Sequence, residues 1–404
     1  MKTEHLMDCI GQIDDRIIAE ADNSTPTSKP AKRPWIKWGA AAAAACLVIA
    51  LPLMLNRRQP TDPADFSSLP KLAVNTTCEE HGFGFEGYFA FNVHELYSHN
   101  PWSENNDLTT LPVFTNPTQY DDTGKLVKGL SAAEMTAKAQ QAASVMGLTI
   151  DHIVLHPTEE ELTQEAQKTG KQPDPATEYV TADCGGVTIT AMPNGHVALA
   201  FENGVSLPDG YSFTLEKTTE PQAKEAMQYL LDTYAPLVDM KAPALSLFGD
   251  YSVEARRLFD YAAYEKDGNL TDQILGYNFN YIRFTPNDNG ELWLIGRSSA
   301  DYLLSQKIGD YPIITAEKAR MLLLDKHYIS TVPAELPGED YIAHVELMYR
   351  TGRSDMIFMP YYKFLVEMPT MQKENGLKTF GVFYVPAVKE EFLENMPLWD
   401  GGFH

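Results

Sequence analysis

The sequence is poor in cysteine and, over most of its length, in basic residues. It has four cysteines in 404 residues, far below the density of a disulfide-stapled scaffold. Of its 32 Lys+Arg and 55 Asp+Glu, eight and six lie before residue 59, which leaves 24 and 49 for the remainder. A nucleic-acid-binding protein needs clustered Lys and Arg to displace the counterions of the phosphates. Nucleic acid is therefore not expected as a partner.

Complete catalytic and cofactor motifs are also missing. Gly82, Gly84 and Gly87 spell GxGxxG, but they lie within an aromatic, strand-like run rather than between a strand and a helix. His94-Glu95 and His99 imitate a zinc protease, yet the histidines are five residues apart instead of four and would point away from each other on a helix. These patterns predict no cofactor and no metal ligand.

Three further patterns fall short in the same way. His5 and Cys9 begin the His-x3-Cys-x2-Cys pattern of zinc-binding anti-sigma factors, but Gln12 occupies the position of the second cysteine. PNDNG at 286–290 lacks the flanking ligands of a calcium loop and predicts a turn. No GxSxG occurs. The chain is therefore predicted not to be an enzyme, with an exported hydrolase as the alternative, because a triad assembled in space is invisible in sequence.

One long apolar run extends from Trp38 to Leu55. Its eighteen residues carry no charge and would span about 27 Å as a helix. Four basic residues precede it: Lys29, Lys32, Arg33 and Lys37. The length of the run predicts one transmembrane helix in the cell membrane. The basic residues on its N-terminal side predict a cytoplasmic N-terminus and an extracytoplasmic C-terminal portion. A cleaved signal peptide, a lipidated Cys46 and a buried soluble helix are the alternatives.

Under this topology, Cys78 and Cys184 are the two cysteines outside the membrane. They could form a disulfide in that environment or remain thiols, since a chain with a core of this size does not need a staple. The bond requires a fold that brings their Cα atoms within about 7 Å of each other.

Residues 1–21 are predicted to form an amphipathic cytoplasmic helix. Leu6, Ile10, Ile13 and Ile17 fall within an arc of about 60° and form one apolar stripe. A short helix with such a stripe needs a partner, which could be a protein, another copy of itself or the membrane surface. Residues 22–37 are predicted to be a tether, and residues 56–70 a linker rich in Pro, Asp and Ser.

The remainder, residues 71–404, predicts an α+β fold of helix-plus-antiparallel-meander modules, at 71–215, 216–310 and 311–404. Ser131 with Glu134 predicts a capped helix that ends at Gly147. Two further helices are predicted at 222–234 and 315–324, and strands at 152–155, 187–190, 196–201, 277–284, 291–295, 342–350, 359–368 and 378–388. In the strand 359–368, Tyr362, Phe364 and Val366 alternate with Lys363 and Leu365, which predicts one buried face.

Several stretches resemble known sequences. The head MKTEHLMDCIGQIDDRIIAEAD, followed by KRPWIKWG and the alanine-rich run, is similar to anti-sigma-type single-pass proteins of Gram-positive anaerobes. GFGFEGYFAFNVHEL, NPWSENNDLTTLPVF, GDYPIITAEKA, MPYYKFLVEMP and FYVPAV resemble an uncharacterised group with such anchors. The modules resemble, in outline, PepSY-like domains of extracytoplasmic regulators. The resemblance implies location and architecture, but no catalytic residues. Because Gln12 replaces the second cysteine, an anti-sigma-like head is expected to be the kind without zinc.

These observations predict a membrane-anchored regulator with an extracytoplasmic sensing or protein-binding region. Its cytoplasmic stripe, Leu6 to Ile17, would bind a protein, with a sigma factor as the candidate partner. The alternative is an envelope-associated binding module whose N-terminal segment is a passive anchor. The extracytoplasmic ligand is not identified by the sequence.

Overall fold

The computed structural model describes residues 66–76, 86–121, 125–158, 160–161, 163, 178–352 and 355–401. The chain divides into two compact units, residues 1–68 and 69–404. All but three of the described residues belong to the second unit, which is the subject of the following paragraphs.

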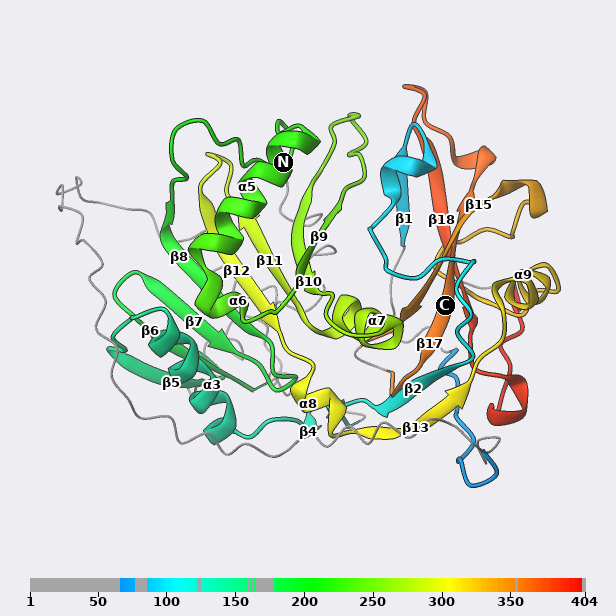
Figure 1. Cartoon of the computed structure of the whole chain (residues 1–404), viewed down its shortest axis with the longest axis horizontal. Helices are drawn as coiled ribbons and strands as arrows, with labels where there is room; N and C mark the ends of the chain where they lie inside the picture. The colour runs from blue at the N-terminus through cyan, green and yellow to red at the C-terminus, as the bar shows by residue number, and fades with distance from the viewer. Residues whose placement is uncertain are drawn as a thin grey trace. The chain divides into compact units, whose positions relative to one another are not determined.

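The largest element of this unit is an antiparallel eight-stranded sheet (Figure 1). Its strands in spatial order are β5 (His152–His156), β6 (Tyr179–Asp183), β7 (Val187–Ala191), β8 (Val197–Val205), β12 (Leu292–Ser298), β11 (Tyr281–Pro286), β10 (Asp260–Glu265) and β9 (Pro243–Phe248). The turn between β7 and β8 contains Asn194 and Gly195, as the sequence predicted, and Gly195 has a φ of 87°. β5 and β9 are the two edges.

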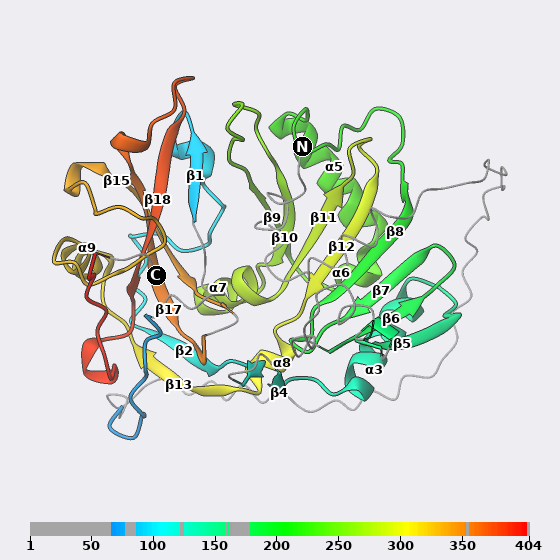
Figure 2. The ribbon, with the colours of Figure 1, turned by 180° about the vertical axis from the view of Figure 1, so that it is seen from behind.

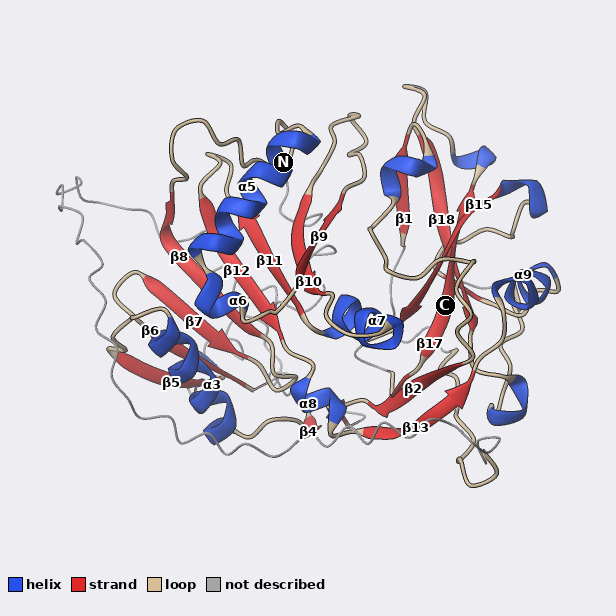
Figure 3. Cartoon of the chain, in the orientation of Figure 1, coloured by secondary structure: helices blue, strands red, loops and turns tan. Residues whose placement is uncertain are grey.

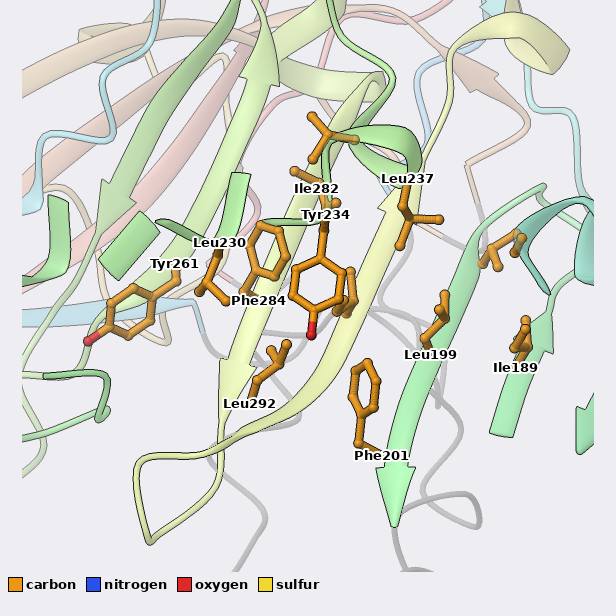
Figure 4. Close-up of a cluster of buried hydrophobic side chains, with 14 of the residues drawn as sticks. Ile189, Leu199, Phe201, Leu230, Tyr234, Leu237, Tyr261, Ile282, Phe284 and Leu292 are labelled. Carbon is orange, nitrogen blue, oxygen red and sulfur yellow. The ribbon is translucent and has the colours of Figure 1, made fainter. Parts of the chain in front are cut away.

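Helices α3 (Ala132–Val145), α5 (Glu220–Thr233) and α6 (Ala235–Val238) pack on one face of this sheet. The capping box of Ser131 and Glu134 starts α3 as predicted, and Gly147 follows its end with a φ of 65°. In α5, the buried residues recur at helical spacing. Figure 4 shows the core that results, in which the Tyr234 ring lies 5.9 Å from that of Phe284 and 6.4 Å from that of Phe201.

The second large sheet of the unit is antiparallel and has five strands (Figure 2). Its strands are β1 (Gly87–Ala90), β18 (Lys378–Pro386), β17 (Pro360–Glu367) and β15 (Ile342–Tyr349), with β14 (Ile329–Ser330) also on β18. Tyr362, Phe364 and Val366 belong to one apolar cluster, together with helix α9 (Ala316–Leu324). Tyr361 and Leu365 belong to another. β17 is thus buried on both faces, so the prediction of a single buried face was wrong.

Smaller elements complete the unit (Figure 3). A three-stranded sheet contains β13 (Lys307–Pro312), β2 (Thr110–Thr115) and β16 (Ile357–Phe358), and a hairpin contains β3 (Gln119–Tyr120) and β4 (Leu126–Lys128). The short helices are α8 (Asp301–Leu304), η1 (Val93–Leu96), η2 (Glu339–Tyr341), η3 (Pro369–Met371) and η4 (Glu390–Phe392). Of these elements, β2, β3 and β4 lie between β1 of the five-stranded sheet and β5 of the eight-stranded sheet along the chain, and α8 and β13 follow β12.

Helix α7 (Leu270–Phe279) occupies residues that the sequence predicted to begin a strand at Tyr277. A capping box of Asn269 and Asp272 starts the helix. The predicted strand 277–284 is therefore correct only from Tyr281, where β11 begins. The capping box that starts α7 was not recognised in the sequence.

The predicted α+β class of separate modules is contradicted, because the described part of the chain is mostly antiparallel sheet. Strands of the first predicted module, 71–215, instead pair with strands that lie beyond it: β8 with β12, β1 with β18, and β2 with β13. A strand at the end of a small meander leaves backbone N–H and C=O groups unpaired. Pairing across long sequence separations satisfies those groups and joins the segments into shared sheets.

Among the residues that the structure describes, no helix is long and apolar enough to cross a membrane. This finding contradicts the predicted single-pass arrangement with one transmembrane helix. The predicted span 38–55, the predicted helix 1–21, the tether 22–37 and most of the linker 56–70 lie outside the described residues.

Gly276 allows α7 to approach β10 closely. A Cβ atom at this position would lie 1.9 Å from the backbone carbonyl oxygen of Glu265. Gly276→Ala is expected to lower the free energy of unfolding by about 2 to 3 kcal/mol, since relieving the clash must separate two backbones. In a free helix the same change would stabilise by about 1 kcal/mol. Chemical denaturation checks the sign, and Thr271→Ala in the same helix is the control, expected to be neutral or slightly stabilising. A stabilising Gly276→Ala would contradict the close packing.

Candidate functional site

A buried polar region lies on one face of the five-stranded sheet. Lys363, on the central strand β17, is 8% exposed. Its cross-strand neighbours are Glu346 on β15 and Tyr384 on β18. Because side chains alternate along a strand, Lys363 shares its face with Tyr361 and Leu365 rather than with Tyr362. A charged group is therefore placed within an apolar layer, where it requires partners.

Glu86, just before β1, provides the opposite charge. Its Oε1 lies 2.8 Å from Lys363 Nζ and accepts a hydrogen bond from the Tyr88 hydroxyl at 2.6 Å. Its Oε2 accepts from the Tyr384 hydroxyl at 2.7 Å. Burial by itself would raise the pKa of Glu86, but the Lys363 ammonium and the two hydroxyls hold that pKa below its usual value. The pair is therefore charged in the folded state.

A second group of polar side chains adjoins the pair through Glu346. The Ser98 hydroxyl donates to Glu346 Oε1 at 2.8 Å, and the Tyr277 hydroxyl of α7 donates to Ser98 Oγ at 2.6 Å. His344 Nε2 lies 3.4 Å from Glu346 Oε1, and the Tyr97 ring stacks on His344 at 4.2 Å. Burial would raise the pKa of Glu346, but His344 and Lys363 hold it below its ordinary value.

We call this group the polar junction: Glu86, Tyr88, Ser98, Tyr277, His344, Glu346, Lys363 and Tyr384. A serine hydrolase needs a hydroxyl that hydrogen-bonds a basic imidazole. Here Ser98 donates to Glu346 instead, and His344 contacts the same carboxylate rather than Ser98. Ser98 is also only 8% exposed. The geometry suits a structural connection between segments better than nucleophilic attack.

The segment 86–100, which contains β1 and η1, connects this sheet to the edge of the other. On one side β1 pairs with β18, and Asn100 Nδ2 donates to the Leu347 carbonyl at 3.1 Å. On the other side the Ser246 hydroxyl of β9 donates to the Ser98 carbonyl at 2.8 Å, and the Tyr264 hydroxyl of β10 donates to the His99 carbonyl at 3.2 Å. Any relative movement of the two sheets must break or remake these bonds.

The eight-stranded sheet carries its own buried polar pair at the start of β8. His196 is 9% exposed, and its Nδ1 lies 2.8 Å from the hydroxyl of Ser298 on β12. Burial, and then the charges of Arg283 and Arg297, lower the pKa of His196 to about 4. Arg283 in turn pairs with Asp260, with 2.8 Å between Nε and Oδ1. His196 is therefore neutral in the folded protein at pH 7.

The residues predicted from sequence are not gathered at either place. Leu6, Ile10, Ile13, Ile17 and Cys78 lie outside the described residues. Cys184 is buried, and its disulfide with Cys78 stays a prediction because Cys78 lies outside the described residues. Within the described part of the chain, no group of three or more His, Cys, Asp or Glu residues could hold a metal ion. Glu95, next to His94, caps η1 together with Asn92.

Sequence reasoning missed the polar junction. One signal was available: a lysine in the apolar run YYKFLV and a glutamate in GFEGYF, each with aromatic neighbours. Charged residues within such runs are almost never buried unless paired. The pairing of β1 with β18, which brings Glu86 close to Lys363, could not be read from the sequence.

Comparison with known proteins gives no family for this chain. No family model matches it, and the search of curated proteins also found no match.

Proposed function

We propose that the chain is a sensing or protein-binding regulator. In this proposal the folded unit 69–404 binds a ligand or protein, and the N-terminal stripe of Leu6, Ile10, Ile13 and Ile17 binds a second protein, with a sigma factor as the candidate. The observation that favours it over catalysis is that the ionisable groups of the polar junction bond to one another. An active site would instead direct such groups at a substrate.

The segment 86–100 supports the sensing part of the proposal. Its hydrogen bonds to β9, β10 and α7 on one side, and to the five-stranded sheet on the other, couple the two sheets. A ligand that prefers one arrangement of the sheets would shift the equilibrium of the whole unit by its difference in affinity. A regulator needs such coupling to respond to its ligand, whereas a passive anchor does not.

The stripe is tested by substitution. Ile10→Asp together with Ile13→Asp is expected to abolish capture of the candidate sigma factor, because each buried aliphatic side chain contributes about 1.5 to 3 kcal/mol. Ile18→Asp is the matched control, since Ile18 lies about 120° around the predicted helix from Leu6. Purified full-length variants are compared for binding to the same purified partner.

The control should bind like the wild type, and the double variant should not. Equal binding by the wild type and the double variant would remove the regulator proposal in favour of a passive N-terminal segment. Equal loss in both variants would show that charge, rather than the stripe, governs binding.

A further inference from the structure

β5 is an edge of the eight-stranded sheet (Figures 1 and 2). It pairs with β6 on one side, and no other strand of the described residues lies on its other side. Natural sheets protect such edges with lysines, prolines, bulges or very short strands. The five residues of β5 contain no lysine and no proline, and their register with β6 is regular.

β5 exposes two apolar side chains on one face of the sheet. Ile153 is 36% exposed and Leu155 is 45% exposed, and both point to the same face because they are two residues apart. Their partners on β6, Ala182 and Val180, are at most 1% exposed. On this face of the sheet the apolar surface therefore extends to the edge strand itself, and no polar strand of the described residues lies beyond it.

The sequence of β5, His-Ile-Val-Leu-His, reads nearly the same in both directions. When two copies pair antiparallel about a two-fold axis at Val154, Ile153 of each copy faces Leu155 of the other, and His152 faces His156. The same surface then serves both copies, as a symmetric dimer requires. On the opposite face, His156 Nδ1 lies 2.7 Å from Glu161 and His152 Nε2 lies 3.8 Å from Asp183, so each histidine has an acidic neighbour in its own copy.

We propose that two copies of this chain associate through β5, with the two eight-stranded sheets joined into one continuous sheet. The partner of this edge is a second copy of the chain. The nearly palindromic sequence of β5 lets two identical strands place an aliphatic residue opposite an aliphatic residue and a histidine opposite a histidine. Association covers Ile153 and Leu155 and pairs the backbone groups of the edge. It does not depend on the regulatory proposal above.

The test exploits the register. Ile153→Lys with Leu155→Lys places lysines opposite each other across the axis and should weaken dimerisation of the full chain at least about tenfold. Ile153→Lys with Leu155→Glu places opposite charges in the same positions and should retain dimerisation. Sedimentation velocity over a concentration series measures both, and unchanged melting temperatures confirm that these exposed substitutions leave the fold intact.

A second readout uses a cysteine at the axis. Val154→Cys in the full chain should form an intermolecular disulfide under mild oxidation, because the two copies of this residue face each other. Val127→Cys, at a residue 60% exposed in the β3–β4 hairpin, controls for random collision and for the four native cysteines. A monomeric wild type, equal dimerisation of the two charge variants, or equal cross-linking of the two cysteine variants would each overturn the proposal.

Discussion

Lys363→Met is expected to lower the free energy of unfolding by about 3 kcal/mol, as the loss of one partner of a buried ion pair usually does. Methionine fills the space of the lysine stem but leaves the charge of Glu86 without its ammonium partner. We expect the lower end of the usual range, because the Glu86 side chain keeps 24% exposure to water. Chemical denaturation of the full chain, extrapolated to water, measures the loss.

Two further variants separate this effect from a general loss of charge. Lys307→Met removes an ion pair with Asp310 whose side chains are 42% and 56% exposed, and it should cost less than about 1 kcal/mol. Lys363→Met combined with Glu86→Gln should recover most of the stability, since the amide oxygen can still accept from one of the hydroxyls of Tyr88 and Tyr384, and the amide NH2 can donate to the other, without burying a charge. A double variant as unstable as the single one would show that lysine packing, and not the ion pair, matters.

The second large effect is a dependence of stability on pH that arises from His196. Its pKa is about 4 in the folded state, against 6.5 as the ordinary value. Between these values the unfolded chain binds a proton at this site that the folded chain does not, so stability falls as pH decreases from about 6.5 to 4. The shift corresponds to about 3 kcal/mol of folding stability, and this contribution is lost completely only below pH 4.

His196→Gln removes this titration, and its amide can still bond Ser298. The stability of the variant should therefore fall by about 3 kcal/mol less than that of the wild type between pH 7 and pH 4. His94→Gln, at an exposed histidine on η1, is the control for the substitution itself. Parallel profiles for wild type and His196→Gln would mean that His196 titrates normally in the folded protein.

Local signals in the sequence predicted many elements correctly. The capping box at Ser131 located α3, and Thr315 located the start of α9. The turn at Asn194 and Gly195 placed β7 beside β8, and three strands of the five-stranded sheet were predicted near their observed positions. These features succeed because caps and turns satisfy backbone groups within a few residues, so they depend little on the rest of the chain.

The sequence by itself determined the acidic balance of the chain and the approximate positions of these helices and hairpins. The tertiary structure decided which strands became neighbours and therefore which polar residues are buried. Lys363 occupies a position that alternation alone would leave in water, yet layers on both sides of β17 bury it next to Glu86, 277 residues away in the sequence. His196 likewise loses its ordinary basicity because the pairing of β8 with β12, and of β12 with β11, buries it near Arg297 and Arg283. Burial and charge proximity arise from contacts between distant segments, and such contacts leave no periodic signal along the chain.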